Sequence, residues 1–282
     1  MQIPTPLIRI IQWTLIAYGI IGIALYYLQD KLVIHPTRLE LEDKYSFTYP
    51  HKEVNLQYED NVIFHLVQFT TKDSTPKGVV LYFHGNRENI ERYARFAPFF
   101  TKEGYEVWMC DYPAFGKSRG EFSEALVYEE SIQVYKLARQ QFSSDQIIVY
   151  GKSLGTGPAT YLASKRDCKQ LILETPYLSI PDVATHFFWM YPVKQMMQYD
   201  FPNKKHILLV DAPITIYHGT NDRVIPYAHA QELYQLQPNR AELVTLPKGT
   251  HHNLMKFPLM QDHLKNVLRK QTDIKLESLS LP

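Results

Sequence analysis

A five-residue segment in the middle of the chain, GKSLG at positions 151–155, matches the pattern G-x-S-x-G. It follows an apolar run at 147–150 and precedes a stretch rich in Ala and Leu, so it falls between a predicted strand and a predicted helix. A sharp turn at such a place lifts the serine hydroxyl clear of the sheet, and the flanking glycines let the backbone crowd around it. The segment therefore predicts Ser153 as a catalytic nucleophile.

A serine hydroxyl needs a neighbouring base, and the base needs a carboxylate that orients it. After a nucleophile turn of this kind the partners follow in the order serine, acid, histidine, each on a loop behind a strand. Asp222 comes just after the predicted strand 214–218, and both His251 and His252 come just after the predicted strand 242–246. Asp222 is thus the expected acid, whereas spacing alone does not separate the two histidines.

Glu174 is a second candidate for the acid. It stands at the end of the predicted strand 171–174, one strand before the one that leads to Asp222. Some hydrolases carry the carboxylate at that earlier strand end. The sequence favours Asp222 and keeps Glu174 as its rival.

The oxyanion that forms during acyl transfer needs two backbone N–H donors. One is expected from Leu154, the residue after the serine, and the other from a loop that follows an earlier strand. The residues His84, Gly85 and Asn86 directly follow the predicted strand 78–83. We assign the second donor to the amide of Asn86, with Gly85 allowing close approach and His84 bracing the loop.

Composition and motifs give no sign of a cofactor, a metal or nucleic acid. Neither G-x-G-x-x-G nor G-x-x-x-x-G-K-[ST] is present, which argues against a dinucleotide or nucleoside triphosphate site. The two cysteines, Cys110 and Cys168, belong to no C-x-x-C pair or zinc-spaced cluster. The 30 Lys and Arg residues against 29 Asp and Glu leave a net charge of +1, which gives no electrostatic footprint for nucleic acid.

The elements that must position these residues alternate along the chain. The predicted strands are residues 54–58, 62–70, 78–83, 106–111, 147–150, 171–174, 214–218 and 242–246, and the predicted helices are 89–102, 123–141, 154–165, 229–236 and 253–270. Such a βαβ series predicts an α/β fold, a mostly parallel eight-stranded sheet with helices on both faces. The stretch 178–211, rich in aromatic residues and Met and interrupted by Pro, predicts an inserted lid of short helices.

The N-terminus carries a candidate membrane anchor. The 19 residues from Ile10 to Leu28 contain no charge, and as a helix they would span about 28 Å, close to the thickness of a bilayer core. We expect residues 1–30 to form a single-pass anchor; a cleaved signal peptide and a buried helix are the alternatives, and no A-x-A site follows the segment. The basic residues Arg9 and Lys31 flank the span without deciding on which side of the membrane the rest of the chain lies.

With these motifs the sequence resembles the α/β-hydrolase superfamily, and more narrowly its membrane-anchored serine hydrolases, the acyl-protein thioesterase-like and monoacylglycerol lipase-like members. The segments that carry the resemblance are 82–86, 111–118, the nucleophile turn, 213–226 and 249–254. In this group the catalytic histidine commonly precedes Asn, which implies His252 as the base. The sequence departs from the group at 113–115, where Pro-Ala-Phe replaces a familiar arginine-glycine-tyrosine, and this difference bears on the shape of the pocket.

The resemblance implies an α/β-hydrolase domain over residues 31–282, with the lid at about 178–211. It implies cleavage of ester or thioester bonds through an acyl-enzyme on Ser153, with Asp222 and His252 completing the triad and no cofactor or metal. The substrate would be a small-molecule or lipid acyl compound, or an acylated protein. Because the same triad serves amides, a serine peptidase or amidase is the alternative, followed by a non-catalytic fold that binds an acyl ligand or a partner.

One further expectation concerns the anchor. All the proposed catalytic groups follow Phe83 in the chain. We therefore expect a chain without residues 1–29 to keep its activity on short soluble esters and to lose activity on long-chain substrates embedded in vesicles.

Overall fold

The computed structural model describes residues 5–269, and the ends of the two predicted domains, residues 1–4 and 270–282, lie outside this range. The main sheet has eight strands in the order β10-β9-β8-β7-β4-β6-β3-β2. They are β2 (His51–Glu59), β3 (Val62–Phe69), β4 (Gly78–Phe83), β6 (Tyr105–Asp111), β7 (Ile147–Lys152), β8 (Gln170–Glu174), β9 (Ile214–Gly219) and β10 (Ala241–Leu246). Strand β3 pairs antiparallel with β2 and β6, and the other pairings are parallel. The predicted mostly parallel eight-stranded sheet is confirmed.

The central strands are apolar because both of their faces are covered. All residues of β4 and of β7 are buried, and continuous apolar runs are what strands covered on two sides need. The edge strand β2 is mostly exposed and correspondingly polar. A short parallel pair, β1 (His35–Pro36) with β5 (Arg87–Glu88), lies apart from the main sheet and ties the N-terminal segment to the loop after β4.

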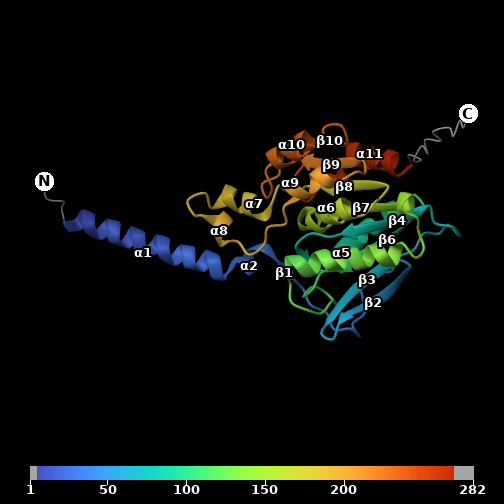
Figure 1. The fold of residues 1–282 in the computed structure, drawn as a ribbon, viewed down its shortest axis with the longest axis horizontal. Coiled ribbons are helices and arrows are strands. Elements are labelled where there is room, and N and C mark those ends of the chain that lie inside the picture. Colours follow the sequence, from blue (N-terminus) through green and yellow to red (C-terminus); the bar gives the residue numbers. More distant parts are fainter. Residues whose placement is uncertain (1–4, 270–282) are drawn as a thin grey trace, which may run out of the picture.

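Helices lie on both faces of the sheet (Figure 1). One apolar core joins the sheet to α5 (Glu124–Ala138), α6 (Thr156–Lys165) and α10 (Tyr227–Leu236). A second core joins the opposite face to α3 (Ile90–Tyr93), α4 (Ala97–Thr101) and α11 (Pro258–Arg269). The chain therefore has the α/β layering that the sequence predicts, with two cores separated by the sheet.

Two predicted helices are broken in the structure. The segment 89–102 forms α3, the 3₁₀ turn η1 (Ala94–Phe96) and α4, and the segment 253–270 forms η5 (Leu254–Lys256) and then α11. Pro98 lies in the first turn of α4 and Pro258 begins α11. Proline lacks the N–H that a continuous helix would need at these places, so each proline starts a new helix instead.

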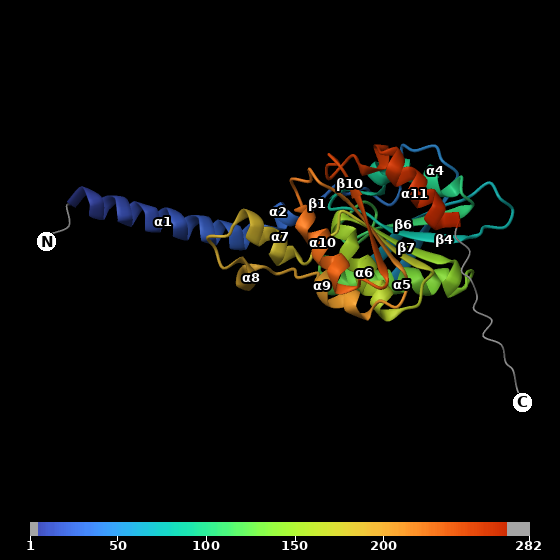
Figure 2. The same cartoon turned by 90° about the horizontal axis from the view of Figure 1, so that it is seen from above.

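The N-terminal helix α1 (Thr5–Tyr27) extends away from the body of the molecule (Figures 1 and 2). Its stretch Pro6–Tyr27 has a mean hydropathy of 1.7, is long and apolar enough to cross a membrane, and is not buried against the rest of the chain. The short helix α2 (Gln29–Val33) follows and leads into the body. An apolar helix without a covering partner is not a core helix.

The predicted lid region contains α7 (Ile180–Phe187), α8 (Val193–Met196), α9 (Asn203–His206) and the 3₁₀ turn η4 (Ile207–Leu209). Helices α7 and α8 lie beside the C-terminal half of α1 in both views (Figures 1 and 2). The rings of Tyr18 and Tyr191 stack with centroids 4.5 Å apart, and the Tyr18 hydroxyl donates to the carbonyl oxygen of Met190 at 2.8 Å. The N-terminal helix and the lid thus contact each other directly.

Candidate active site

Ser153 lies at the turn between β7 and α6, in the short 3₁₀ segment η3 (Ser153–Gly155). Its φ of 52° is in the left-handed region, which a non-glycine residue adopts only when its surroundings impose it. A Cβ on Gly155 would stand 2.1 Å from the carbonyl oxygen of Phe83, and a Cβ on Gly151 would stand 2.5 Å from the carbonyl oxygen of Gly155. The two motif glycines are therefore required by the close backbone packing that holds Ser153 in this conformation.

Three side chains form a continuous hydrogen-bonded chain at this turn. The Nε2 atom of His251 lies 2.8 Å from Ser153 Oγ, and its Nδ1 atom lies 2.8 Å from Asp222 Oδ2. The other carboxylate oxygen of Asp222 accepts the backbone N–H groups of Val224 and Ile225 at 2.8 and 2.9 Å. This is the order of contacts by which a histidine, oriented by a carboxylate, can take a proton from a serine.

His252 does not enter this chain, and the structure corrects the expected choice between the two histidines. Its exposed ring packs edge-on against the ring of His251, with centroids 5.0 Å apart. The Asn253 side chain accepts the N–H of Thr250 at 2.7 Å, which closes a tight turn over 250–253. Within this turn neighbouring side chains point in different directions, and His251 is the one that faces Ser153.

Glu174, the rival acid, is engaged elsewhere. It is buried at the end of β8, where it accepts a hydrogen bond from the Tyr150 hydroxyl at 2.6 Å and forms an ion pair with Lys152. Its hydrogen bonds go to neither His251 nor His252. Geometry therefore favours Asp222 over Glu174 as the partner of the histidine.

The Asp222 carboxylate is held in its ionised form. Burial by itself would raise the pKa of Asp222, but hydrogen bonds from His218 and His251 outweigh burial and lower the pKa below its usual range. His218 Nε2 lies 3.4 Å from the Asp222 carboxylate and 3.0 Å from the carbonyl oxygen of Ile225. An ionised carboxylate at this place stabilises the positive charge that His251 gains when it accepts a proton.

The two expected oxyanion donors flank Ser153. The Asn86 side chain donates to the carbonyl oxygen of Val33 at 2.8 Å, and the backbone carbonyl oxygen of Asn86 accepts the N–H of His35 at 2.9 Å. These contacts fix the loop after β4. Within residues 5–269 the backbone N–H groups of Asn86 and Leu154 donate to no other atom, so both are available to a developing oxyanion.

Comparison with known proteins identifies the fold. A family model described as serine aminopeptidase, S33, matches residues 74–206. Human ABHD12B is 25% identical over 71% of this chain and 62% of its own length, and α/β hydrolase domain-containing protein 17C of Xenopus tropicalis is 28% identical over 67% and 61%. The chain spans about three fifths of the length of these curated relatives. The Pyrococcus furiosus esterase Pf2001 superposes with a TM-score of 0.65 at 21% identity, covering 83% of this chain and 98% of its own. The chain has the α/β-hydrolase fold, and its curated relatives include proteins named as α/β hydrolase domain-containing.

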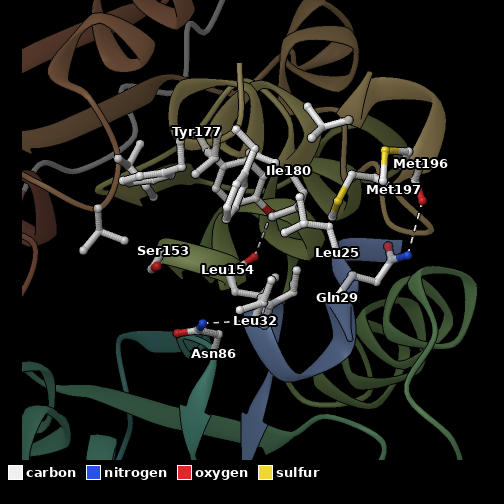
Figure 3. A pocket seen from close by; sticks show the side chains of 18 residues that line it. Leu25, Gln29, Leu32, Asn86, Ser153, Leu154, Tyr177, Ile180, Met196 and Met197 are labelled. Carbon is white, nitrogen blue, oxygen red and sulfur yellow. Dashed lines mark hydrogen bonds between the residues drawn. The ribbon is translucent and has the colours of Figure 1, made fainter. Parts of the chain in front are cut away.

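An apolar cavity of about 210 Å³ runs from Ser153 into the lid. Figure 3 shows Ser153 and Asn86 at one end and Met196 and Met197 at the other. No Asp, Glu, Lys or Arg side chain is among its lining residues. A cavity of this kind suits an apolar chain that ends at a reactive carbonyl beside Ser153.

Residues from the N-terminal helices also line the cavity, which the sequence did not lead us to expect. They are Leu25, Gln29, Leu32 and Val33, from the end of α1 and from α2 (Figure 3). A chain without residues 1–29 would lack part of this wall. Contrary to the expectation drawn from the sequence, such a truncation should also impair hydrolysis in solution. The apolar residues 32–34, which follow the uncharged span, were the feature of the sequence that could have indicated this contact.

A second, smaller hollow opens on the other side of Ser153. Its volume is about 30 Å³, and it is bordered by His251, His252, Lys152 and three arginines that follow the oxyanion loop, Arg87, Arg92 and Arg95. Sequence reasoning missed these arginines, although three of them within nine residues of the loop were a visible signal. The two cavities share only Ser153 and Asn86.

Proposed function

We propose that this α/β hydrolase is a serine hydrolase that cleaves ester or thioester bonds of acyl substrates. The observation that supports it is the hydrogen-bonded chain from Ser153 through His251 to Asp222. Ser153 Oγ attacks the substrate carbonyl while His251 Nε2 takes its proton, and the N–H groups of Asn86 and Leu154 receive the oxyanion. His251 then gives the proton to the departing oxygen or sulfur, and water releases the acyl group by the same steps.

The apolar cavity is the proposed place of the acyl chain. Its lining has no charged side chain, so an extended hydrocarbon fits it better than a polar group does. The family model that matches residues 74–206 is described as an aminopeptidase, which would have to bind the ammonium group of a peptide N-terminus. Neither cavity is lined by an Asp or Glu side chain that could pair with an ammonium group. This favours an acyl ester or thioester over a peptide.

We also propose that residues 1–30 anchor the enzyme in a membrane and that residues 31–282 form the hydrolase domain. The stretch Pro6–Tyr27 is apolar and unburied, which fits a membrane span and disfavours a core helix. Leu25 and Gln29 line the apolar cavity, so removal of the segment as a signal peptide would open the site. Lipid acyl compounds and acylated proteins at the membrane surface would then be within reach of Ser153.

Labelling with a fluorophosphonate tests the proposal on the full-length protein in neutral detergent. We expect Ser153 to be labelled, and Ser153→Ala to abolish both the labelling and the hydrolysis of octanoyl esters. His251→Ala should lower turnover by about 10³-fold or more, since loss of a triad member has this effect. His252→Ala is the matched control and should lose far less. Absence of labelling on folded protein would favour a non-catalytic binding fold, and a larger loss from His252→Ala would move the base to that residue.

A further inference from the structure

The smaller hollow carries a concentration of positive charge. Its basic lining side chains are Arg87, Arg92, Arg95 and Lys152, and no acidic side chain lines it. Arg92 pairs with Glu88, and Lys152 pairs with Glu174. Within residues 5–269, neither Arg87 nor Arg95 has a carboxylate oxygen within 4.0 Å. Two of the four cations are thus available to a ligand.

This positive charge lowers the pKa of His252, which borders the same hollow. Partial desolvation lowers the pKa of His252, and the neighbouring positive groups, among them His251, Lys152, Arg92 and Arg87, lower it further. Arg87 belongs to β5 and Arg92 to α3, both in the segment that supplies the Asn86 amide. The charged wall is therefore built on the same short piece of backbone as the oxyanion loop.

The proton transfers of the proposed reaction decide which part of a substrate faces this hollow. When the tetrahedral intermediate collapses, the bond from the carbonyl carbon to the departing oxygen or sulfur breaks, and that atom takes the proton from His251 Nε2. The leaving group must therefore lie on the side of His251. His251 borders the smaller hollow and does not line the apolar cavity.

We propose that the smaller hollow binds a negatively charged group on the leaving side of the substrate, resting on the proposed serine hydrolase function. The hollow next to Ser153 is small, about 30 Å³. Arg87 and Arg95 are exposed at its border, so the negative group would lie between them at the mouth. Arginine binds phosphate and carboxylate oxygens through paired N–H donors.

The substrate class that fits both cavities is a single-chain acyl ester or thioester whose alcohol or thiol bears a nearby negative charge. A membrane lipid with one acyl chain and a phosphate head group has this chemistry. A soluble acyl thioester of a phosphorylated thiol has it too. The two sources differ in whether the charge is presented at a membrane surface or in solution, and an experiment can separate them.

The test compares matched substrates with the full-length protein in neutral detergent micelles. One pair is 1-octanoylglycerol and 1-octanoylglycerol 3-phosphate, and the other is S-octanoyl-2-mercaptoethanol and its phosphate ester, S-octanoyl-2-mercaptoethyl phosphate. We expect kcat/KM to be about tenfold or more higher for the charged member of at least one pair, as charged hydrogen bonds to arginine would give. Raising the salt from about 0.05 M to about 0.5 M should reduce this preference, because salt screens exposed charges.

The variant that isolates the arginines is the double substitution Arg87→Gln and Arg95→Gln. It should lose about tenfold in kcat/KM on the preferred charged substrate and stay within about twofold on its neutral partner. Arg166→Gln is the matched control, because Arg166 is an exposed arginine at the end of α6 and lines neither cavity. Melting curves of all variants should coincide with that of the wild type, since the side chains replaced are exposed.

The outcomes separate this inference from the function on which it rests. Equal losses on charged and neutral substrates, or a wild type without preference for a charged member, would overturn the charged-group proposal while hydrolysis itself remains. Absence of hydrolysis with all four compounds, together with absence of Ser153 labelling, would overturn the proposed function. A preference confined to the glycerol phosphate points to a lipid head group, and one confined to the mercaptoethyl phosphate thioester points to a soluble thioester.

Discussion

Gln29 joins the N-terminal segment to the lid, and its replacement tests whether that junction holds the lid in place. Its side-chain oxygen accepts the N–H of Gln198 at 2.7 Å, and its amide nitrogen donates to the carbonyl oxygen of Met196 at 3.2 Å (Figure 3). The residue is 3% exposed. Gln29→Leu keeps the approximate volume but leaves two backbone groups of the lid without partners. At about 1–3 kcal/mol for each unpaired group, the docked lid should lose about 2–6 kcal/mol.

That loss is measurable as hydrogen exchange. Because about 1.4 kcal/mol corresponds to a factor of ten, amide exchange around α8 should accelerate by about 30- to 20,000-fold. Gln12→Leu is the matched control, since Gln12 lies on the exposed part of α1, away from the lid contacts. Exchange near α8 that changes by less than about threefold in Gln29→Leu would refute the reasoning, because the two hydrogen bonds would then contribute little to docking.

Four other substitutions test separate parts of the structure. Glu130 is fully buried, its pKa is raised well above the usual 4.5 by burial and by Asp111, and its oxygens have no hydrogen-bond partner within residues 5–269. The folded state therefore favours the protonated acid, and the protein loses stability as the pH rises above 4.5. In calorimetry at pH 8, Glu130→Gln should melt at a higher temperature than the wild type. This difference in melting temperature should shrink towards pH 4.5. Asp222→Asn should lower kcat by about 10⁴-fold on an octanoyl ester, whereas Glu174→Gln should cost mainly stability; similar losses of kcat would contradict the assignment of the acid. Gly155→Ala would bring its Cβ to 2.1 Å from a backbone oxygen, and urea unfolding should show a loss of about 1–3 kcal/mol or more; unchanged stability would mean that the turn relaxes freely.

The strands and the nucleophile turn could be predicted because their causes are local. Strands such as β4 are covered on both faces, so their sequences are continuous apolar runs that can be recognised without the structure. The choice between His251 and His252 could not be made this way, because it depends on the turn that Asn253 closes by accepting the Thr250 N–H. Spacing left the two residues equivalent, and the family pattern of histidine before asparagine favoured His252, whereas His251 is the one that contacts Ser153 and Asp222.

The wall of the apolar cavity was beyond sequence reasoning for a different reason. An uncharged run identifies α1 as a candidate membrane span by length and composition alone. The contact of its last turns with the lid depends on side chains some 170 positions apart, such as Tyr18 and Tyr191. The hydrophobic periodicity of one helix does not indicate which distant segment packs against it. The arginines of the smaller hollow likewise could not be linked to the site from the sequence, because only the fold places them beside His251.

The stacking of Tyr18 on Tyr191 sets how deep the lid would reach if α1 spans a bilayer. Tyr18 stands ten residues before Leu28, about 15 Å along a helix, which places the lid segment beside it well below the membrane surface. Trp189 and Met190 in that segment are 75% and 59% exposed, as side chains that face hydrocarbon would be. An acyl chain would then move from the lipid into the apolar cavity without being exposed to water. For a chain of about ten methylenes this avoids a hydration barrier of roughly 8 kcal/mol, so the docked lid would act as a dry passage between the bilayer and Ser153.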